Sequence, residues 1–467
     1  MRTTKHMHSP VIEKETREKP FGQSEKVVAA ELVKYKQFGT NGQYFPHEIK
    51  QFSNATSVTD FVESSVTNGT FTHDTRYQLQ AKNEQYDAHG NLTLSYDAND
   101  TPTSLVWAYN NALPIAQIRN ASPSQAAAFV FDDNRTSGWA GANGTWSITN
   151  GEYRQTDASN TTVWTLPKRY DNLIFDDAIL EAEVRIDDAG IPRFATIYKF
   201  IDSNNFTRFE LRRTASGNYV RIHARKNAVD VNFEVPKSLN ANQWYRLRGE
   251  IQGSTAKLYL DGELLVTWTD ANVDLTAGKI GLGTWASIAS FDNVRFYPLN
   301  ALATSVSFDP GFFKINAKTD ESGISTVFTY DALARLSEIR DRANNLIKDF
   351  DYFYSSPFSA TNPNYIEEKT YRDVTQLTTN RNWYDGLGRA VQAQQNLGTG
   401  SIKVGTVYDA LNRPVKVTKP FSSTAQTFTT GDPITAANSD YSNRTAYYPS
   451  YNPDTSPYAY SETESYA

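Results

Sequence analysis

Residues 245–262 read YRLRGEIQGSTAKLYLDG and contain two short alternating runs separated by Gln252-Gly253-Ser254-Thr255. Alternation with period two places successive side chains on opposite faces of a strand, and a short Gly-containing connection joins two such strands into a hairpin. Asp261-Gly262 then supplies a strong two-residue turn signal. Similar runs at 179–186 and 219–224 are bounded by the same turn residues. The sequence therefore predicts an all-β fold.

One segment is ambiguous. Residues 26–36, KVVAAELVKYK, fit an amphipathic helix as well as a strand followed by alternation. Both readings stay open from the sequence.

Composition excludes several classes of protein. The chain has 467 residues, which favours two or three domains, and 13% aromatic residues argue against disorder. Cysteine is absent, so thiol nucleophiles, disulfides and thiolate metal sites are excluded. The net charge of −6 gives no reason to expect a nucleic-acid partner. No run approaches the ~20 apolar residues of a membrane span.

A Tyr-Asp turn unit recurs on both sides of the middle of the chain. The aspartate can accept backbone N–H bonds in an Asx-turn, and the fifth position requires a residue that tolerates positive φ. The four copies, each given as Tyr, Asp and fifth position, are Tyr86, Asp87, Gly90; Tyr330, Asp331, Ala334; Tyr384, Asp385, Gly388; and Tyr408, Asp409, Asn412. Ala334 is the exception, where either the turn type changes or strain is accepted. We expect each copy to form one hairpin that stacks on its neighbours.

These units, as in YDALARLSEIRD and WYDGLGRAVQAQQ, resemble the YD repeats of the Rhs and teneurin-like superfamily. The resemblance implies an antiparallel hairpin array forming part of a β-cage, secreted or at the cell surface, that can enclose a C-terminal toxin. It assigns repeat regions to residues 25–120 and 300–467. Residues 1–24 are charged, lack the apolar core of a signal peptide and are expected to be flexible. The second repeat region is expected to be truncated at its C-terminus.

Residues 125–298 lack the complete unit and resemble a concanavalin A-like jelly roll of the laminin G or glucanase type. The stretches NFTRFEL (205–211), NQWYRL (242–247) and GKIGLGT (278–284) carry this resemblance. It implies a β-sandwich inserted into the repeat array. Because this fold hosts lectins, glycosidases and spacers, it does not by itself fix a function. No cofactor is expected, although the resemblance leaves room for a structural calcium ion near Asp292-Asn293 and Asp132-Asp133.

Catalytic motifs are weak. A glycosidase needs two carboxylates across the scissile bond, and the nearest candidates are Glu181 and Glu183, with Asp187 and Asp188 beyond. Carboxylates at i and i+2 are common on solvent-facing strands. The six histidines show no metal-ligand spacing. The sequence thus predicts no catalytic residue, no metal site and a non-enzymatic protein, with glycoside hydrolysis as a weak alternative.

Two functions remain open. The first is a structural shell segment that encapsulates or displays other parts of the protein. The alternative is a carbohydrate-directed protein whose sandwich binds glycan, with glycans as partners. Exposed aromatic rings could stack on sugars, and Trp285, in a stretch of small residues, is expected on a loop at the sheet edge as the first candidate.

Overall fold

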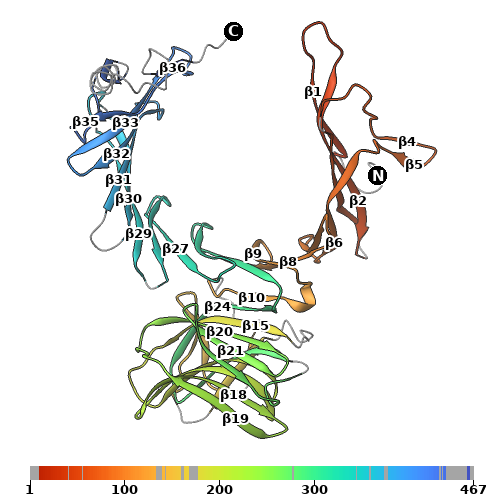
Figure 1. Ribbon diagram of the computed structural model, residues 1–467, viewed down its shortest axis with the longest axis vertical. Helices are drawn as coiled ribbons and strands as arrows, with labels where there is room; N and C mark the ends of the chain where they lie inside the picture. The colour runs from red at the N-terminus through yellow and green to blue at the C-terminus, as the bar shows by residue number, and fades with distance from the viewer. Residues whose placement is uncertain are drawn as a thin grey trace, which may run out of the picture. The chain divides into compact units, whose positions relative to one another are not determined.

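The computed structural model describes residues 10–39, 42–54, 56–132, 139–141, 143–158, 162–167, 177–275, 278–342, 344–356, 359–372, 377–430, 433, 435–437 and 460–462. The chain divides into two units, residues 1–325 and 326–467, which are described separately. Figure 1 shows that strands make up nearly all of the regular structure. The all-β prediction is confirmed.

The first unit contains a set of antiparallel strands, here called the hairpin strands. They are β1 Glu13–Glu18, β2 Lys26–Phe38, β3 Gln43–Phe52, β6 Tyr77–Tyr86, β7 Leu92–Asp97, β8 Pro102–Ala108, β9 Leu113–Arg119, β25 Leu302–Phe308 and β26 Ile315–Thr319. Strands β4 (Ser65–Thr67) and β5 (Thr70–Thr72) form a separate small hairpin. Strand β9 pairs directly with β25. The chain between them is therefore an insertion between two neighbouring strands.

The N-terminal segment differs from the expectation of flexibility. Residues 13–18 form β1, which pairs with β2 from Glu13↔Leu32 to Glu18↔Lys26. Glu13 also accepts a hydrogen bond from the Tyr77 hydroxyl at 2.7 Å. The partners that order this charged segment lie in other strands, so its own sequence does not indicate that it is ordered. Residues 1–9 lie outside the described part of the chain.

The ambiguous segment at 26–36 lies within β2. Val27, Ala30 and Leu32 are buried there in a small cluster with Phe52 and Tyr77. Pairing with β1 on one side and β3 on the other supplies the hydrogen bonds that select the strand over the helix.

The insertion is a sandwich of two antiparallel sheets. The proximal sheet, named for its contact with the hairpin strands, contains β10 Ala127–Phe129, β12 Trp146–Thr149, β13 Glu152–Gln155, β15 Ala178–Ile186, β20 Trp244–Gln252, β21 Thr255–Leu260, β22 Glu263–Thr269 and β24 Ala289–Pro298. The distal sheet contains β11 Trp139–Gly141, β14 Thr162–Pro167, β16 Arg193–Asp202, β17 Asn205–Thr214, β18 Gly217–Lys226, β19 Val229–Pro236 and β23 Lys279–Trp285. The 3-10 turn η1 (Pro123–Gln125) precedes β10.

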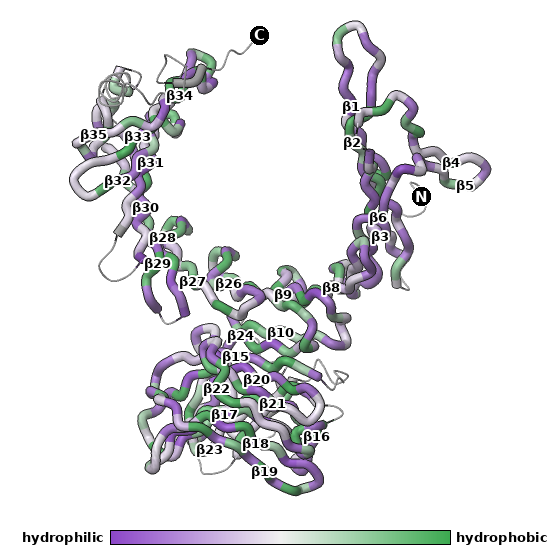
Figure 2. The backbone as a smooth tube through the Cα atoms, viewed as in Figure 1, coloured by the Kyte–Doolittle hydropathy of each residue, from purple (hydrophilic) through white to green (hydrophobic). Residues whose placement is uncertain are grey.

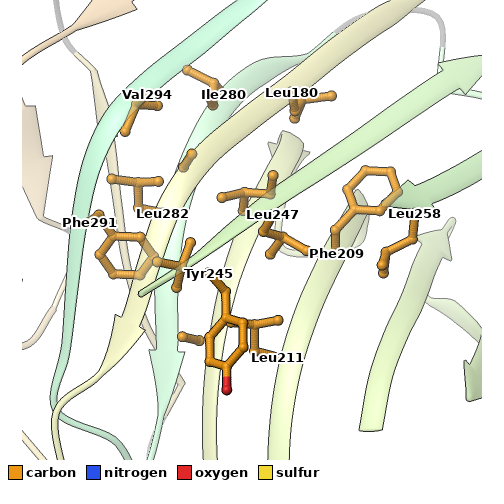
Figure 3. Packing of buried hydrophobic residues seen from close by; sticks show 14 of the residues in the cluster. Leu180, Phe209, Leu211, Tyr245, Leu247, Leu258, Ile280, Leu282, Phe291 and Val294 are labelled. Carbon is orange, nitrogen blue, oxygen red and sulfur yellow. The ribbon is translucent and has the colours of Figure 1, made fainter. Parts of the chain in front are cut away.

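Apolar side chains from both sheets fill the space between them. Leu247 and Leu258 of the proximal sheet and Phe209 and Leu282 of the distal sheet belong to one buried cluster (Figure 3). Tyr245 also points into this core, as expected for one residue of the Trp244-Tyr245 pair. Figure 2 shows hydrophobic and hydrophilic segments alternating along these strands. This is the pattern of strands with one buried and one outward face.

The second unit is a succession of antiparallel strands, beginning with β27 at the boundary. Its strands are β27 Ser325–Tyr330, β28 Leu336–Asp341, β29 Leu346–Phe353, β30 Asn364–Tyr371, β31 Leu377–Tyr384, β32 Ala390–Leu397, β33 Gly400–Tyr408, β34 Pro414–Thr418, β35 Phe421–Ser423 and β36 Tyr460–Glu462. Over the described residues, no helix is long and apolar enough to cross a membrane.

The four Tyr-Asp units form tight turns stabilised by their aspartates. Asp87 Oδ1 accepts hydrogen bonds from the backbone N–H of His89 at 2.8 Å and of Asn91 at 2.9 Å. Asp331, Asp385 and Asp409 accept the equivalent pairs. The tyrosines end or nearly end the preceding strands, as in Tyr384↔Ala390 and Tyr330↔Leu336.

The fifth position of every copy is left-handed. Its φ is +85° at Gly90, +57° at Ala334, +77° at Gly388 and +65° at Asn412. Ala334 therefore keeps the same turn type and accepts the strain of a Cβ at positive φ. Of the two options that the sequence left open at Ala334, the structure selects strain.

Candidate functional site

The part of the proximal sheet's outer face that lies on β15 and β24 is covered by the hairpin strands of the same unit. Ile179 and Tyr297 from this face lie in a buried cluster with Ile115, Ile118 and Ala303 of the hairpin strands. Figure 1 shows β15 and β24 on the side of the sandwich nearest β8 and β9, and β18 and β19 on the far side. The proximal sheet therefore serves to attach the sandwich.

A buried ionic network crosses this attachment. Arg295, 2% exposed, pairs with Glu181 at 2.7 Å and donates a hydrogen bond to the Ala303 carbonyl at 2.9 Å. Glu181 also accepts a hydrogen bond from the Tyr297 hydroxyl at 2.5 Å. Burial alone would raise the pKa of Glu181, but the charge of Arg295 outweighs it and holds the pKa below its usual value.

The carboxylates considered for glycoside hydrolysis are thus structural. The expectation that Glu181 and Glu183 face solvent is wrong, because the outer face of β15 is covered by hairpin strands that the local sequence does not reveal. Glu183 accepts hydrogen bonds from Asn293 at 2.8 Å and from Ser325 at 2.6 Å. Asp187 and Asp188 pair with arginines, Arg185 and Arg193 respectively.

The positions suggested for calcium are placed as follows. Asn293 belongs to the attachment network through Glu183, and its neighbour Asp292 is 7% exposed. Asp132 lies within the described residues and Asp133 outside them. In the described part of the chain, no group of three or more His, Cys, Asp or Glu could hold a metal ion.

The outer face of the distal sheet is the opposite case, because many of its side chains remain partly exposed. The strand registers place these side chains in rows that cross the sheet. One row runs from Thr162 and Trp285 through Phe194 and Arg212 to Tyr219 and Pro236. The next runs from Trp164 and Gly283 through Thr196 and Glu210 to Arg221 and Glu234. We call these two rows the distal face.

Aromatic rings lie at one edge of the distal face. Trp285 and Phe194 stack with ring centroids 4.9 Å apart and an interplanar angle of 23°. The guanidinium of Arg212 lies 4.5 Å from the centre of the Phe194 ring. Trp285 is the last residue of β23, paired with Phe194 and Thr162, so its expected loop position is wrong. Of the small residues that suggested a loop, Gly283 and Thr284 lie within β23, and Ala286 and Ser287 follow it.

A second aromatic group includes Trp164 of the second row and continues beside it, and Gly283 makes room for it. Trp164 and Phe200 have ring centroids 4.8 Å apart, and both pack in a cluster with Tyr198 and Phe206. A Cβ at Gly283 would lie 2.6 Å from the Tyr198 ring. Glycine at 283 therefore lets the tyrosine lie flat against β23.

Charged side chains occupy the middle of the distal face. Glu210 is fully buried and forms ion pairs with Arg208, at 2.6 Å, and with Arg221. Burial opposes ionisation of Glu210, but the charges of Arg208 and Arg221 prevail and lower its pKa. Glu210 is therefore a carboxylate at neutral pH and not a proton donor.

His223 is likewise committed to its neighbours. One ring nitrogen lies 3.0 Å from Arg208 Nε and the other 2.8 Å from Asp230 Oδ1. Burial, followed by the charge of Arg208, lowers the pKa of His223. The imidazole is neutral at pH 7, with both nitrogens engaged. The distal face thus offers aromatic surface and cationic donors rather than an acid and base pair.

Sequence reasoning identified Trp285 on this face but missed Phe194, Arg212, Glu210 and Arg221. The available signal was the alternation of aromatic and charged residues in FTRFELRRT (206–214) and in YVRIHARK (219–226). The repeat-turn residues lie in the hairpin strands and the second unit, where they hold turns.

Comparison with known proteins identifies two regions. Residues 127–297 match a family described as a 3-keto-alpha-glucoside-1,2-lyase-like domain. Residues 357–467 match a domain of unknown function, DUF6443. Neither description names the Rhs or YD repeat. No curated protein matches the chain.

Solved structures similar to the sandwich include two bacterial proteins. The carbohydrate binding module CBM66 from Bacillus subtilis is 23% identical, with 34% of this chain and 95% of that chain covered and a TM-score of 0.30. The Bacillus licheniformis beta-glucanase is 16% identical, with 37% and 98% covered and a TM-score of 0.30.

Proposed function

We propose that the sandwich is a non-catalytic glycan-binding module whose site is the distal face. The observation that carries this proposal is the Trp285–Phe194 stack beside Arg212, on the outer face that attachment leaves accessible. Aromatic faces stack on the C–H surfaces of sugars, and guanidinium groups donate to their oxygens. The lyase-like family match of residues 127–297 favours this carbohydrate-directed reading over a purely structural shell.

Binding is favoured over catalysis by the state of the titratable groups. Lyase chemistry requires a base that can remove a proton next to a carbonyl, and hydrolysis requires a carboxylic acid. Glu210 is held ionised by arginines, and His223 has both ring nitrogens engaged. Neither group is available for proton transfer without breaking these contacts.

The hairpin strands and the second unit, on this proposal, form a shell of the Rhs or YD-repeat type that carries the module. Contacts between successive hairpins support a stacking role: Arg389 lies 4.7 Å from the centre of the Tyr408 ring and donates to Asn412 Oδ1 at 2.7 Å. We further propose that the protein acts outside the cell, where polysaccharides are accessible. An enclosed C-terminal toxin stays a prediction.

The test is titration of the full chain with a panel of soluble polysaccharides. The full chain is needed because excising residues 125–298 would expose the apolar surface of Ile179 and Tyr297. Trp285→Ala should weaken binding by about fivefold, since a stacked ring contributes roughly 1 kcal/mol. Trp268→Ala is the matched control, because Trp268 forms a similar Trp–Phe stack with Phe233 away from the distal face.

The outcomes separate cleanly. If the wild type binds no polysaccharide on a broad panel, the module is a spacer and the structural shell is the better reading. If Trp285→Ala and Trp268→Ala bind as the wild type does, the site lies elsewhere on the protein.

A further inference from the structure

We infer that the distal face recognises a glycan carrying anionic groups, carboxylate or sulfate. This inference rests on the proposed glycan-binding function and names its ligand class. The juxtaposition behind it is an aromatic stack, Trp285 on Phe194, with the Arg212 guanidinium against the Phe194 ring and Arg221 on the next strand.

Charge is distributed unevenly over the chain. The whole sequence has a net charge of −6, yet residues 193–236, which contain β16 to β19, hold eight Lys or Arg against four Asp or Glu, a net charge of +4. The four strands β16 to β19 therefore carry a net positive charge although the whole chain is negative. Clustered positive charge attracts anionic ligands and speeds their association.

Part of that positive charge is already committed. Beneath the surface of the face, Glu210 forms ion pairs with Arg208 and Arg221, and Arg212 Nε lies 3.9 Å from one of its oxygens. Arg212 pairs through Nη1 with Glu234, an exposed side chain on β19. These carboxylates orient the guanidinium groups, but they do not accept from all of the guanidinium N–H donors.

The remaining donors lie on the adjacent strands β17 and β18, and those of Arg212 are beside the Phe194 ring. Among the described residues, the terminal nitrogens of Arg221 and Nη2 of Arg212 have no hydrogen-bond acceptor. Arg212 and Arg221 lie on adjacent strands, diagonally across from each other, through the pairs Arg212↔Tyr219 and Glu210↔Arg221. A guanidinium presents donors in a planar fork that matches a carboxylate or sulfate. An acidic sugar stacked on Trp285 would place its anionic group within the reach of such forks.

The row also continues past Tyr219. A surface hollow of about 380 Å³, lined by residues that include Gly217, Tyr219, Pro236 and Lys237, opens at the end of β18 and β19. A linear polymer lying across the strands would extend into it. The arrangement therefore suits a chain of several sugars better than a single one.

The experiment uses the full chain and polymers that differ only in charge. Polygalacturonate is compared with its methyl ester, dextran sulfate with dextran, and duplex DNA is included as a polyanion without sugar stacking of this kind. We expect one charged polysaccharide to bind about tenfold more tightly than its neutral counterpart, as charge-assisted hydrogen bonds predict. The pair that shows the difference identifies carboxylate or sulfate.

Two variants locate the effect. Arg212→Gln should remove most of the difference between charged and neutral polymer, and Arg212→Lys should restore part of it by returning the charge without the fork. Arg340→Gln, which removes an arginine paired with Glu338 in the second unit, should leave the difference unchanged. Circular dichroism of each variant verifies that it is folded.

Several results would overturn the inference. Equal binding of charged and neutral polymers would refute it while leaving the proposed glycan-binding function intact. Equal weakening by Arg212→Gln and Arg340→Gln, or DNA binding as tight as that of the charged polysaccharide, would reduce the effect to non-specific charge. Absence of binding to every polymer would refute both the inference and the proposed function.

Discussion

Arg295→Ala should strongly destabilise the first unit. The guanidinium is 2% exposed, pairs with the equally buried Glu181 at 2.7 Å and donates to the Ala303 carbonyl. Removing one partner of a buried ion pair leaves an uncompensated charge and typically costs about 3–5 kcal/mol. Arg246, 3.6 Å from Glu181, and the Tyr297 hydroxyl remain, so we expect the lower end, about 3 kcal/mol.

A double-mutant cycle isolates the pair. Glu181→Gln alone should also be costly, because it leaves Arg295 buried with a neutral partner. The double variant, Glu181→Gln with Arg295→Met, removes both charges and should cost less than the sum of the single changes by about 2 kcal/mol. Arg340→Ala, at the more exposed pair with Glu338, is the control and should cost under about 0.5 kcal/mol.

The pH dependence has a definite sign. In the wild type the folded pKa of Glu181 lies below its unfolded value, so the stabilisation is present above the unfolded pKa and is lost as the pH falls through the folded one. In Arg295→Ala, burial is less opposed and the carboxyl gains a proton more easily. The difference between variant and wild type should therefore shrink as the pH falls towards about 4.

Urea unfolding of the full chain, followed by tryptophan fluorescence and circular dichroism, measures these differences. The transition that reports the sandwich is the relevant one, since a chain of two units need not unfold in one step. A cost below about 1 kcal/mol for Arg295→Ala, or strict additivity in the cycle, would show that the network does not hold the sandwich on the hairpin strands.

Three further predictions concern the repeat turns. Gly388→Ala should cost about 1 kcal/mol of stability, because it places a Cβ at positive φ. Gly90→Ala should cost more, because its Cβ would also lie 2.9 Å from the Phe45 ring, whereas no atom lies within 4 Å of a Cβ at Gly388. Equal losses in thermal unfolding would contradict this. Ala334→Gly should stabilise by up to about 0.5 kcal/mol, since relief of strain at φ +57° slightly exceeds the added freedom of the unfolded chain, and a lowered melting temperature would show the reverse. Arg389→Ala should cost about 1 kcal/mol through loss of its contact with the Tyr408 ring, and Arg389→Lys should not fully restore stability; full recovery would mean that charge alone matters.

The turns were predictable because their determinants are local. The turn forms when an aspartate accepts hydrogen bonds from the N–H groups two and four residues later. It also requires a residue that tolerates positive φ three residues after the aspartate, so the whole turn is specified by one short segment. The same rule identifies copies that the Tyr-Asp pattern missed or left incomplete. Asp97 with Asp100 at φ +59°, and Asp341 with Asn344 at φ +68°, form equivalent turns. The aspartate and the left-handed residue therefore define the unit better than the tyrosine does.

The site was less predictable because it depends on registers between distant strands. Glu181 and Trp285 each had a local environment that suggested exposure, on a strand face and on a loop respectively. The structure buries the first, because hairpin strands beyond residue 300 return to cover β15. It holds the second at the end of β23 because Phe194, about ninety residues earlier, pairs with it. Neither relation leaves a mark in the neighbouring sequence.

The point of insertion explains why one face of the sandwich is available. Strands β9 and β25 pair directly, so both connections of the sandwich leave from adjacent positions in the hairpin strands. The proximal sheet contains β10 and β24, the first and last strands of the insertion, and must therefore lie against that edge. The distal sheet is built from strands inside the insertion, so the positions of the chain ends do not require it to lie against the hairpin strands. An insertion with adjacent ends thus assigns attachment to the sheet with the terminal strands. The other sheet's outer face, which carries the aromatic stack and the remaining arginine donors, does not lie against the hairpin strands.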